Sequence, residues 1–303
     1  MSSVRAVGPH GGLPRVLYPS PGGPGTARWL VRFGYDGSRY DGWARQPGRR
    51  TVEGEIRRGL VRHGIAPSSD GGGLEVASRT DRGVSARANA LALQSPLSPG
   101  NLLRSLNGLA PDLFFTAATE IEPRFRVRAA ARRRYRYFDR PSNPHLDRWH
   151  AAAERFVGEI DVRSFGRGLP TSSPILRRIE SVRIREVGGG VEVEVVAPSF
   201  VWGMVRKIVA ALREVDSGRL SLARLENALD GRERLTLPMA EPEPLVLWDV
   251  EYPLAWTYHW RGPNRHQARW WTDRRSEWLQ RGQVLDWIRG AVEGEEISRG
   301  SER

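Results

Sequence analysis

The chain of 303 residues contains no cysteine, which excludes disulfide bonds, thiolate chemistry and cysteine-based zinc sites. Its six histidines show no spacing typical of metal ligands, so we expect no metal and no other cofactor. No apolar run is long enough to span a bilayer. Residues 1–26 repeat Gly and Pro but lack the apolar stretch of a signal peptide. We therefore predict a cytoplasmic protein, not bound to a membrane, with a disordered leader at 1–26.

Lysine is almost absent, because Lys207 is the only one among 47 basic residues. A GC-rich genome explains this preference for arginine, but it does not explain the net charge of +12 that remains after 35 acidic residues are counted. A basic surplus of this size indicates a nucleic acid or another anionic surface as partner. Arginine is suited to this partner because its guanidinium group forms two parallel hydrogen bonds to phosphate.

Hydrophobic periodicity predicts an α+β protein, because strand, helix, strand, strand and helix follow one another in the first half. Thr51 and Ser98 are the expected helix caps of that half, and Pro99 takes the first position of the second helix. We expect the longest helix to begin at Ser199. The segments predicted as strands are 28–35, 74–76, 89–93, 114–118, 178–184, 191–195 and 245–253, and further helices are predicted at 149–157 and 222–229.

One carboxylate stands between two arginines at the end of a predicted strand. Leu74 and Val76 alternate in that strand, and Asp81 follows between Arg79 and Arg82. The flanking guanidinium groups favour the ionised carboxylate, which can act as a nucleophile in a partly desolvated site. The same composition also fits a surface turn held by ion pairs, so the residues alone leave both interpretations open.

Two other segments have the composition of an RNA-binding surface. Residues 125–138 hold six arginines among aromatic residues, which is typical of a strand that contacts phosphates. Residues 36–43 combine turn residues with Tyr40 and Trp43, which suits contact with bases or the sugar-phosphate backbone. A solvated basic strand and a loop packed on the core are the respective alternatives.

Residues 78–86, Ser-Arg-Thr-Asp-Arg-Gly-Val-Ser-Ala, resemble the catalytic motif of the TruA-type tRNA pseudouridine synthase family, in a form similar to its archaeal branch. Residues 34–47 are similar to the first motif of the family. Residues 125–137 resemble the second motif, which closes on Arg-x-Tyr-x-Tyr, and 200–209 resemble the third, Phe-x-x-x-Met-Val-Arg-x-Ile-Val. The resemblance spans residues 29–253.

This resemblance implies roles for individual residues. Asp81 matches the nucleophile, Tyr135 the active-site tyrosine that stacks on the base and helps to remove the C5 proton, and Arg206 the arginine that pairs with the nucleophile. The substrate-binding residues expected from the matched motifs are Arg79, Arg82, Tyr40, Trp43, Arg45, Arg128, Arg134 and Lys207.

The resemblance also implies an architecture: two related α/β halves that form a continuous, mainly antiparallel sheet with a basic central cleft. We place these halves at 27–140, which carries Asp81, and at 141–254, with 255–303 as a C-terminal extension. The implied protein is a homodimer that isomerises uridine to pseudouridine in the tRNA anticodon stem-loop without a cofactor.

Two other functions are weighed against this one. A non-catalytic RNA-binding protein on the same scaffold explains the charge and the aromatic residues, but not the joint presence of Asp81, Tyr135 and Arg206. A hydrolase acting on nucleosides needs a second carboxylate as acid, and the three matched motifs offer no convincing candidate.

The extension is rich in tryptophan and arginine. Residues 256–303 hold six of the eleven tryptophans, and 256–290 hold seven arginines against three acids. These residues either bind RNA by stacking and charge or cover an apolar patch of the core or of a dimer partner. Val284, Trp287 and Ile288 predict a short amphipathic helix.

Overall fold

The computed structural model describes residues 26–65, 73–170 and 172–293. The leader expected at 1–26 and most of the predicted break at 67–73 therefore lie outside the described residues. No helix in the described ranges has both the length and the apolar character needed to cross a bilayer.

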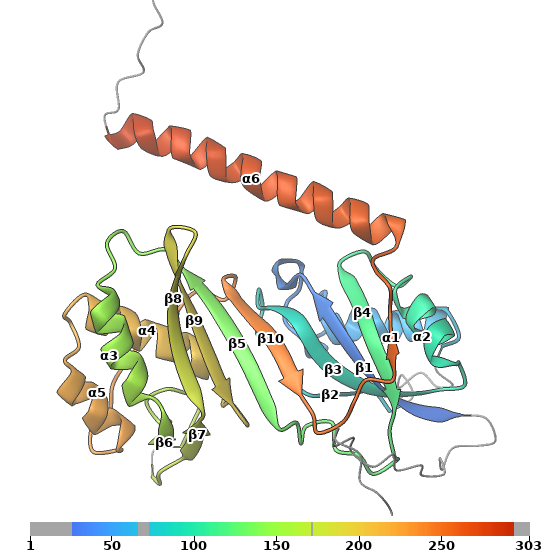
Figure 1. The fold of residues 1–303 in the computed structure, drawn as a ribbon, viewed down its shortest axis with the longest axis horizontal. Coiled ribbons are helices and arrows are strands. Elements are labelled where there is room, and N and C mark those ends of the chain that lie inside the picture. Colours follow the sequence, from blue (N-terminus) through green and yellow to red (C-terminus); the bar gives the residue numbers. More distant parts are fainter. Residues whose placement is uncertain (1–25, 66–72, 171, 294–303) are drawn as a thin grey trace, which may run out of the picture.

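The described strands build a large sheet in the order β11-β4-β1-β3-β10-β5-β9-β8, with β2 paired to β3 (Figure 1). All pairings are antiparallel except the one between β10 and β3, so the predicted α+β fold with a continuous, mainly antiparallel sheet is confirmed. A separate two-stranded sheet pairs β6 with β7. The strands are β1 Ala27–Tyr35, β2 Glu75–Val76, β3 Ser85–Ser95, β4 Leu113–Glu120, β5 Arg132–Asp139, β6 Gly158–Asp161, β7 Leu176–Ile179, β8 Ser181–Val187, β9 Gly190–Ala197, β10 Leu245–Glu251 and β11 Tyr258–His259.

Strand β10 lies in the middle of the sheet, although it comes late in the chain (Figure 1). It pairs with β5 along most of its length and with β3 at only two positions, Val246 with Ser85 and Leu247 with Ala86. Because β3 begins just after Asp81, β10 joins the strand that follows the predicted catalytic residue to the strand that carries Tyr135. The pairing of β10 with both strands therefore brings Asp81 and Tyr135 into one site.

The helices are α1 Val52–Arg62, α2 Pro99–Leu106, α3 Leu146–Arg155, α4 Met204–Asp216, α5 Leu222–Leu229 and α6 Arg265–Glu293, with a short 3₁₀ turn, η1, at Gly37–Arg39. Thr51 caps α1 as predicted, since its hydroxyl accepts a hydrogen bond from the Gly54 amide. Ser98 precedes α2, but its side chain makes no capping hydrogen bond. Pro99 takes the first position of this helix, as predicted.

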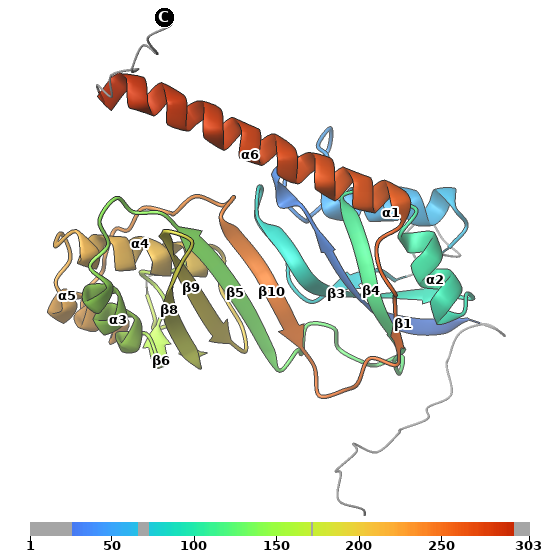
Figure 2. The same cartoon turned by 45° about the horizontal axis from the view of Figure 1, so that its top comes forward.

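The prediction that the longest helix begins at Ser199 is wrong on two counts. Helix α4 begins at Met204, because Gly203 has a φ of +75°, a left-handed conformation that ends helical geometry on its N-terminal side. The 29-residue α6 is longer than α4. Helix α6 runs from the β4 edge across to the other half of the molecule (Figures 1 and 2).

The extension is packed against the core at its start. Trp256 and Trp260 pack on the core, and the Trp260 amide donates to the Thr116 carbonyl. In α6, the Trp271 ring meets Phe114 edge-on at 5.6 Å, whereas Trp278 is half exposed. The short helix expected around Val284 is part of α6, and the side chains of Trp287 and Ile288 lie outside the described part. Packing therefore accounts for the beginning of the extension.

Candidate active site

A cavity of about 1120 Å³ lies beside β5 and the start of α4, and Asp81, Tyr135 and Arg206 all line it. Its walls come from the segments around 41–49, 77–84, β5, the start of α4 and the loop before β10. The charged residues in its lining are Arg49, Arg79, Arg82, Arg128, Arg133, Arg167 and Arg206 against Asp41, Asp81 and Glu243. This excess of guanidinium groups makes the cavity a basic cleft suited to a polyanion.

Two donors hold the Asp81 carboxylate, one on each oxygen. The Trp202 indole Nε1 donates to Oδ1 at 2.8 Å, and Arg206 Nη1 lies 3.2 Å from Oδ2. About a quarter of the Asp81 side chain stays exposed, on the cavity side. A carboxylate with one ion pair and one N–H donor, each on a different oxygen, is fixed in orientation.

Arg206 is itself fixed on its other edge. Its Nε donates to the Ala240 carbonyl at 2.5 Å, and its own carbonyl accepts from the Ala240 amide at 3.4 Å. The side chain is only 14% exposed. One guanidinium group therefore connects the loop before β10 to Asp81. This connection requires N–H groups that point in two directions from one planar group, as those of arginine do.

The flanking arginines do not hold Asp81 as the sequence suggested. Arg82 lies 3.4 Å from Asp41 and is 78% exposed, and Arg79 forms no ion pair with any described residue. Both line the cavity. A strand end turns successive side chains in different directions, so neighbours in sequence need not be partners in space. The arginine that pairs with Asp81 is Arg206, as the resemblance implied.

Tyr135 lies in β5 with its side chain toward the cavity. Its ring meets Phe200 edge-on at 5.0 Å, and the residue is 8% exposed. Burial raises the pKa of Tyr135 to about 12, against the opposing effects of the Arg133 charge and a hydrogen bond with Ser78. The phenol is therefore protonated at neutral pH. It can stack on a base, but it can take up a proton only while passing its own proton on.

The other residues expected to contact RNA divide into two groups. Trp43 and Arg128 line the cavity together with Arg79 and Arg82, although Trp43 is 2% exposed and offers no free ring face. The structure does not bring four others to the cavity: Tyr40, Arg45, Arg134 and Lys207.

Each of those four has another environment. Tyr40 is buried and donates its hydroxyl to Asp112 at 3.0 Å. Arg134 lies on the opposite face of the sheet. Lys207 Nζ donates to the Ser164 carbonyl at 3.4 Å, and burial lowers its pKa. Arg45 is exposed at the surface beside α1, outside the cavity lining.

Sequence reasoning missed Trp202 and Arg167. The Arg167 guanidinium lies over the Trp202 ring at 4.5 Å, and both residues line the cavity. Trp202 stands inside the third matched motif, four residues before Arg206, but a continuous helix would have placed it on a solvated face. The signal was Gly203, which ends the helix and leaves Trp202 free to reach Asp81.

Comparison with known proteins agrees with this geometry. A family model described as tRNA pseudouridine synthase matches residues 152–253. The tRNA pseudouridine synthase A of Thermococcus kodakarensis is 39% identical over 226 residues, which cover 74% of this chain and 84% of the relative. That of Thermococcus onnurineus is 36% identical over 228 residues, 74% of this chain and 85% of the relative. A chain of a solved Cbf5-Nop10-Gar1 complex aligns with 71% of this chain and 56% of its own length at 13% identity, with a TM-score of 0.31. On these relatives, the chain belongs to the tRNA pseudouridine synthase A family.

Proposed function

We propose that this protein isomerises uridine to pseudouridine in the anticodon stem-loop of tRNA, with Asp81 as the nucleophile. One observation carries the proposal: an oriented carboxylate, held by Arg206 and Trp202, lies in a basic cavity that also contains Tyr135. This arrangement offers a nucleophile, an aromatic ring for the base and positive charge for the backbone in one place.

The chemistry follows from these groups. The target uridine leaves its stack, at a cost of a few kcal/mol that phosphate contacts offset. Asp81 attacks the sugar, or stabilises the glycal-like species that forms, as the bond between C1′ and N1 breaks. The uracil rotates and forms a new bond from C5 to C1′, and a bond from Asp81 to C1′ breaks in this step, which restores the carboxylate. Loss of the C5 proton and protonation of N1 complete an isomerisation in which no atom is gained or lost.

Tyr135 is the candidate for stacking on the uracil and assisting the proton transfer. Its phenol is neutral at physiological pH, so we assign it a relay role: it accepts the C5 proton while its own proton leaves for N1, the atom that gains a proton in the isomerisation. The Ser78 hydroxyl, which accepts from Arg133 Nε at 2.9 Å, hydrogen-bonds to the phenol and holds it in place.

The guanidinium groups of Arg79, Arg128 and Arg167 are the candidate phosphate contacts, since each lines the cavity without an acidic partner among the described residues. The homodimer, the cytoplasmic location and the division of the chain into 27–140, 141–254 and 255–303 stay predictions from the sequence.

The test is incubation of the full chain with an unmodified tRNA transcript, followed by carbodiimide mapping of pseudouridine. We expect new modification stops in the anticodon stem-loop with the wild-type protein and none with Asp81→Asn. Stops only outside this stem-loop would contradict the target assignment, and no stops in any tRNA, with binding intact, would favour a non-catalytic RNA-binding protein.

A further inference from the structure

Helix α6 is anchored at its start by buried side-chain amides. Gln267, which is 1% exposed, donates to the Asn107 side chain at 2.9 Å and to the Leu113 carbonyl at 2.7 Å. Asn264 donates to the Asn107 carbonyl at 2.7 Å and accepts from the Gln267 amide as the helix begins. These bonds fix the first turn of α6 to α2 and β4, so the side chains that follow have defined positions.

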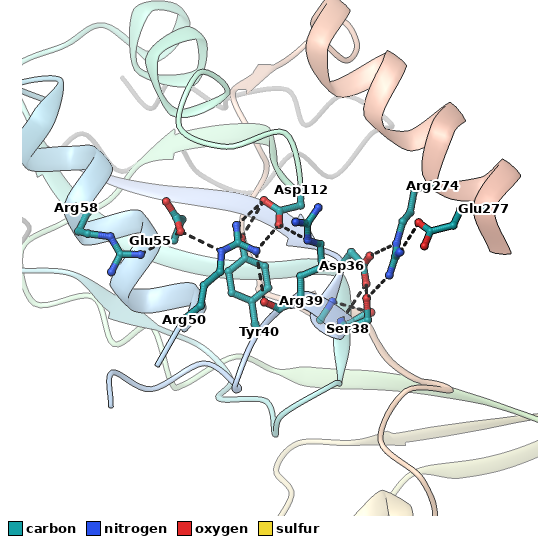
Figure 3. A network of polar contacts seen from close by, with 12 residues as sticks. Asp36, Ser38, Arg39, Tyr40, Arg50, Glu55, Arg58, Asp112, Arg274 and Glu277 are labelled. Atoms are coloured by element: carbon teal, nitrogen blue, oxygen red, sulfur yellow. Dashed lines mark hydrogen bonds and ion pairs between the residues drawn. The ribbon is translucent and has the colours of Figure 1, made fainter. Parts of the chain in front are cut away.

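Two turns later, Arg274 reaches from α6 to the segment that follows β1 (Figure 3). Its Nε lies 3.2 Å from Asp36 Oδ2, and its Nη2 donates to the Ser38 hydroxyl at 2.9 Å. Its Nη1 donates to Glu277 at 2.7 Å, which holds the guanidinium plane on the helix side. The side chain is 20% exposed, so this ion pair is less screened than a fully solvated one.

Asp36 and Ser38 begin a segment, residues 36–43, that contacts the turn at 80–85, which carries Asp81. The Gly37 amide donates to the Ser85 hydroxyl at 3.0 Å, and a Cβ at Gly37 would lie 2.1 Å from the Val84 carbonyl oxygen. Further along, the Trp43 amide donates to the Thr80 carbonyl at 3.0 Å. The two segments are thus bonded at both ends of the turn, and displacement of one displaces the other.

The same segment is held on its second side by a buried ion-pair network (Figure 3). Asp112, nearly inaccessible to solvent, accepts from the Tyr40 hydroxyl and from Arg50 Nη1 at 2.8 Å. The Asp112 carbonyl also accepts from the Asp36 amide at 3.3 Å. Asp36 therefore lies between two supports, the Asp112 network and Arg274, and only Arg274 comes from the extension.

We propose that Arg274 is a positioning residue for the isomerisation: through residues 36–43, it fixes the turn that presents Asp81. The extension then contributes to the rate of the reaction without touching the substrate. This inference rests on the proposed function, because its rate readout is pseudouridine formation. It assigns to α6 a role that neither the Trp/Arg composition nor the matched motifs indicate.

The first experiment measures the single-turnover rate at saturating tRNA and, separately, the tRNA dissociation constant over a range of salt concentrations. For Arg274→Ala we expect a rate roughly tenfold lower, since a small misplacement of reacting groups lowers the rate by one to two orders of magnitude. The dissociation constant and its salt slope should stay within about twofold of wild type, because the Arg274 side chain is paired with Asp36 and Glu277 and does not line the cavity. Arg281→Ala is the matched control, since the one ion pair of Arg281 among the described residues is with Glu277 on the same helix, and its side chain is 67% exposed.

A second pair of variants separates positioning from general destabilisation. Asp36→Asn keeps an oxygen to cap η1 but removes the charge that Arg274 meets. We expect the Arg274→Ala/Asp36→Asn double variant to be no slower than the slower single variant, because both changes break one contact. Arg274→Lys should recover part of the rate. Rate losses that multiply in the double variant would overturn the inference, as would an unchanged rate or a flatter salt slope in Arg274→Ala.

Amide hydrogen exchange gives a readout that does not depend on catalysis. Loss of Arg274 should increase exchange at the Gly37, Trp43 and Val84 amides while the β9 amides stay protected. If the wild-type protein formed no pseudouridine, the proposed function would fall, and this exchange measurement would still decide whether Arg274 holds the turn. Unchanged exchange at these three amides would overturn the inference even in an active enzyme.

Discussion

Arginines lie on the face of β5, β8 and β9 that is turned away from the cavity, here called the open face, and in the loops that line the cavity, here called the cavity face, but their partners differ. On the open face, Arg134 and Arg136 both bind Glu194, a fully buried carboxylate, at 3.2 and 2.9 Å, and Arg183 and Arg185 lie within 4 Å of the same side chain. On the cavity face, Arg79, Arg128 and Arg167 have no acidic partner among the described residues. The arginines of the open face are neutralised by carboxylates of the protein. Those of the cavity face keep a positive charge that can bind a polyanion.

The alternation of β5 places its own side chains on opposite sides of the sheet. Arg133, Tyr135 and Tyr137 point to the buried side of the sheet, and Arg134 and Arg136 point to the other, because successive residues of a strand face opposite ways. A run of arginines in sequence is therefore no measure of RNA-binding capacity. What matters is which arginine side chains lack a carboxylate partner. Single substitutions on the two faces test this difference.

The largest effect is expected at the carboxylate of the cavity face. Asp81→Asn should lower the single-turnover rate by about 10³-fold or more, because the amide lacks the charge of the nucleophile. Binding of tRNA should be little changed. The matched change on the open face, Asp249→Asn, removes a carboxylate that pairs with Arg32 and should leave the rate within about twofold. A comparable rate in Asp81→Asn would show that Asp81 is not the nucleophile.

Arg206→Lys should lower the rate by about 10²-fold, as loss of a preorganised electrostatic contact does. Lysine cannot donate to Asp81 and to the Ala240 carbonyl from two separate edges. Arg213→Lys is the control, because Arg213 lies in the same helix and binds Asp139 through two nitrogens away from the cavity. It should lower the melting temperature but leave the rate per folded molecule unchanged. Equal rate losses in both variants would indicate a common effect on α4.

Trp202→Phe should lower the rate about tenfold, because it removes one hydrogen bond to an ionised carboxylate while keeping an aromatic ring. The counterpart on the open face is Trp248→Phe, whose ring packs against Arg136 at 3.9 Å. We expect that variant to bind and react like wild type. Single-turnover rates of the two variants, measured side by side, check this. A wild-type rate in Trp202→Phe would show that the contact with Trp202 does not contribute and that Arg206 alone orients Asp81.

The smallest effect concerns affinity and tests the two arginine populations directly. Arg128→Gln should weaken tRNA binding about threefold and reduce the salt slope by about 1. Arg134→Gln should leave both unchanged but lower the free energy of unfolding by about 1 kcal/mol, since Glu194 keeps its other arginines. Filter binding at several salt concentrations and thermal melting measure the two quantities. Equal salt slopes in the two variants would remove the distinction between the faces.

Local elements of this protein follow from local sequence. Thr51 starts α1 as predicted, α5 spans the predicted residues, and β9 covers the strand predicted at 191–195, because caps and periodicity act over a few residues. The alternation of Val and Glu in β9 did not predict its burial, because the structure buries almost the whole strand, Glu194 included. Motifs were also enough to nominate Asp81, Tyr135 and Arg206. The α4 start was misplaced, since the left-handed conformation of Gly203 outweighs the apolar stripe that continues through it.

Only the tertiary structure decided which of the 47 basic residues keep a carboxylate partner and which line the cavity without one. The residues next to Asp81 in the chain suggested Arg79 and Arg82 as its partners, the resemblance named Arg206, and the fold confirmed Arg206 and added Trp202, each more than 120 positions away. It likewise paired Arg134 with Glu194 and left Arg128 without an acidic partner among the described residues. The strength of an electrostatic interaction depends on the distance between the charges and on their burial. Both are decided when β10 pairs between β3 and β5 and brings distant parts of the chain together.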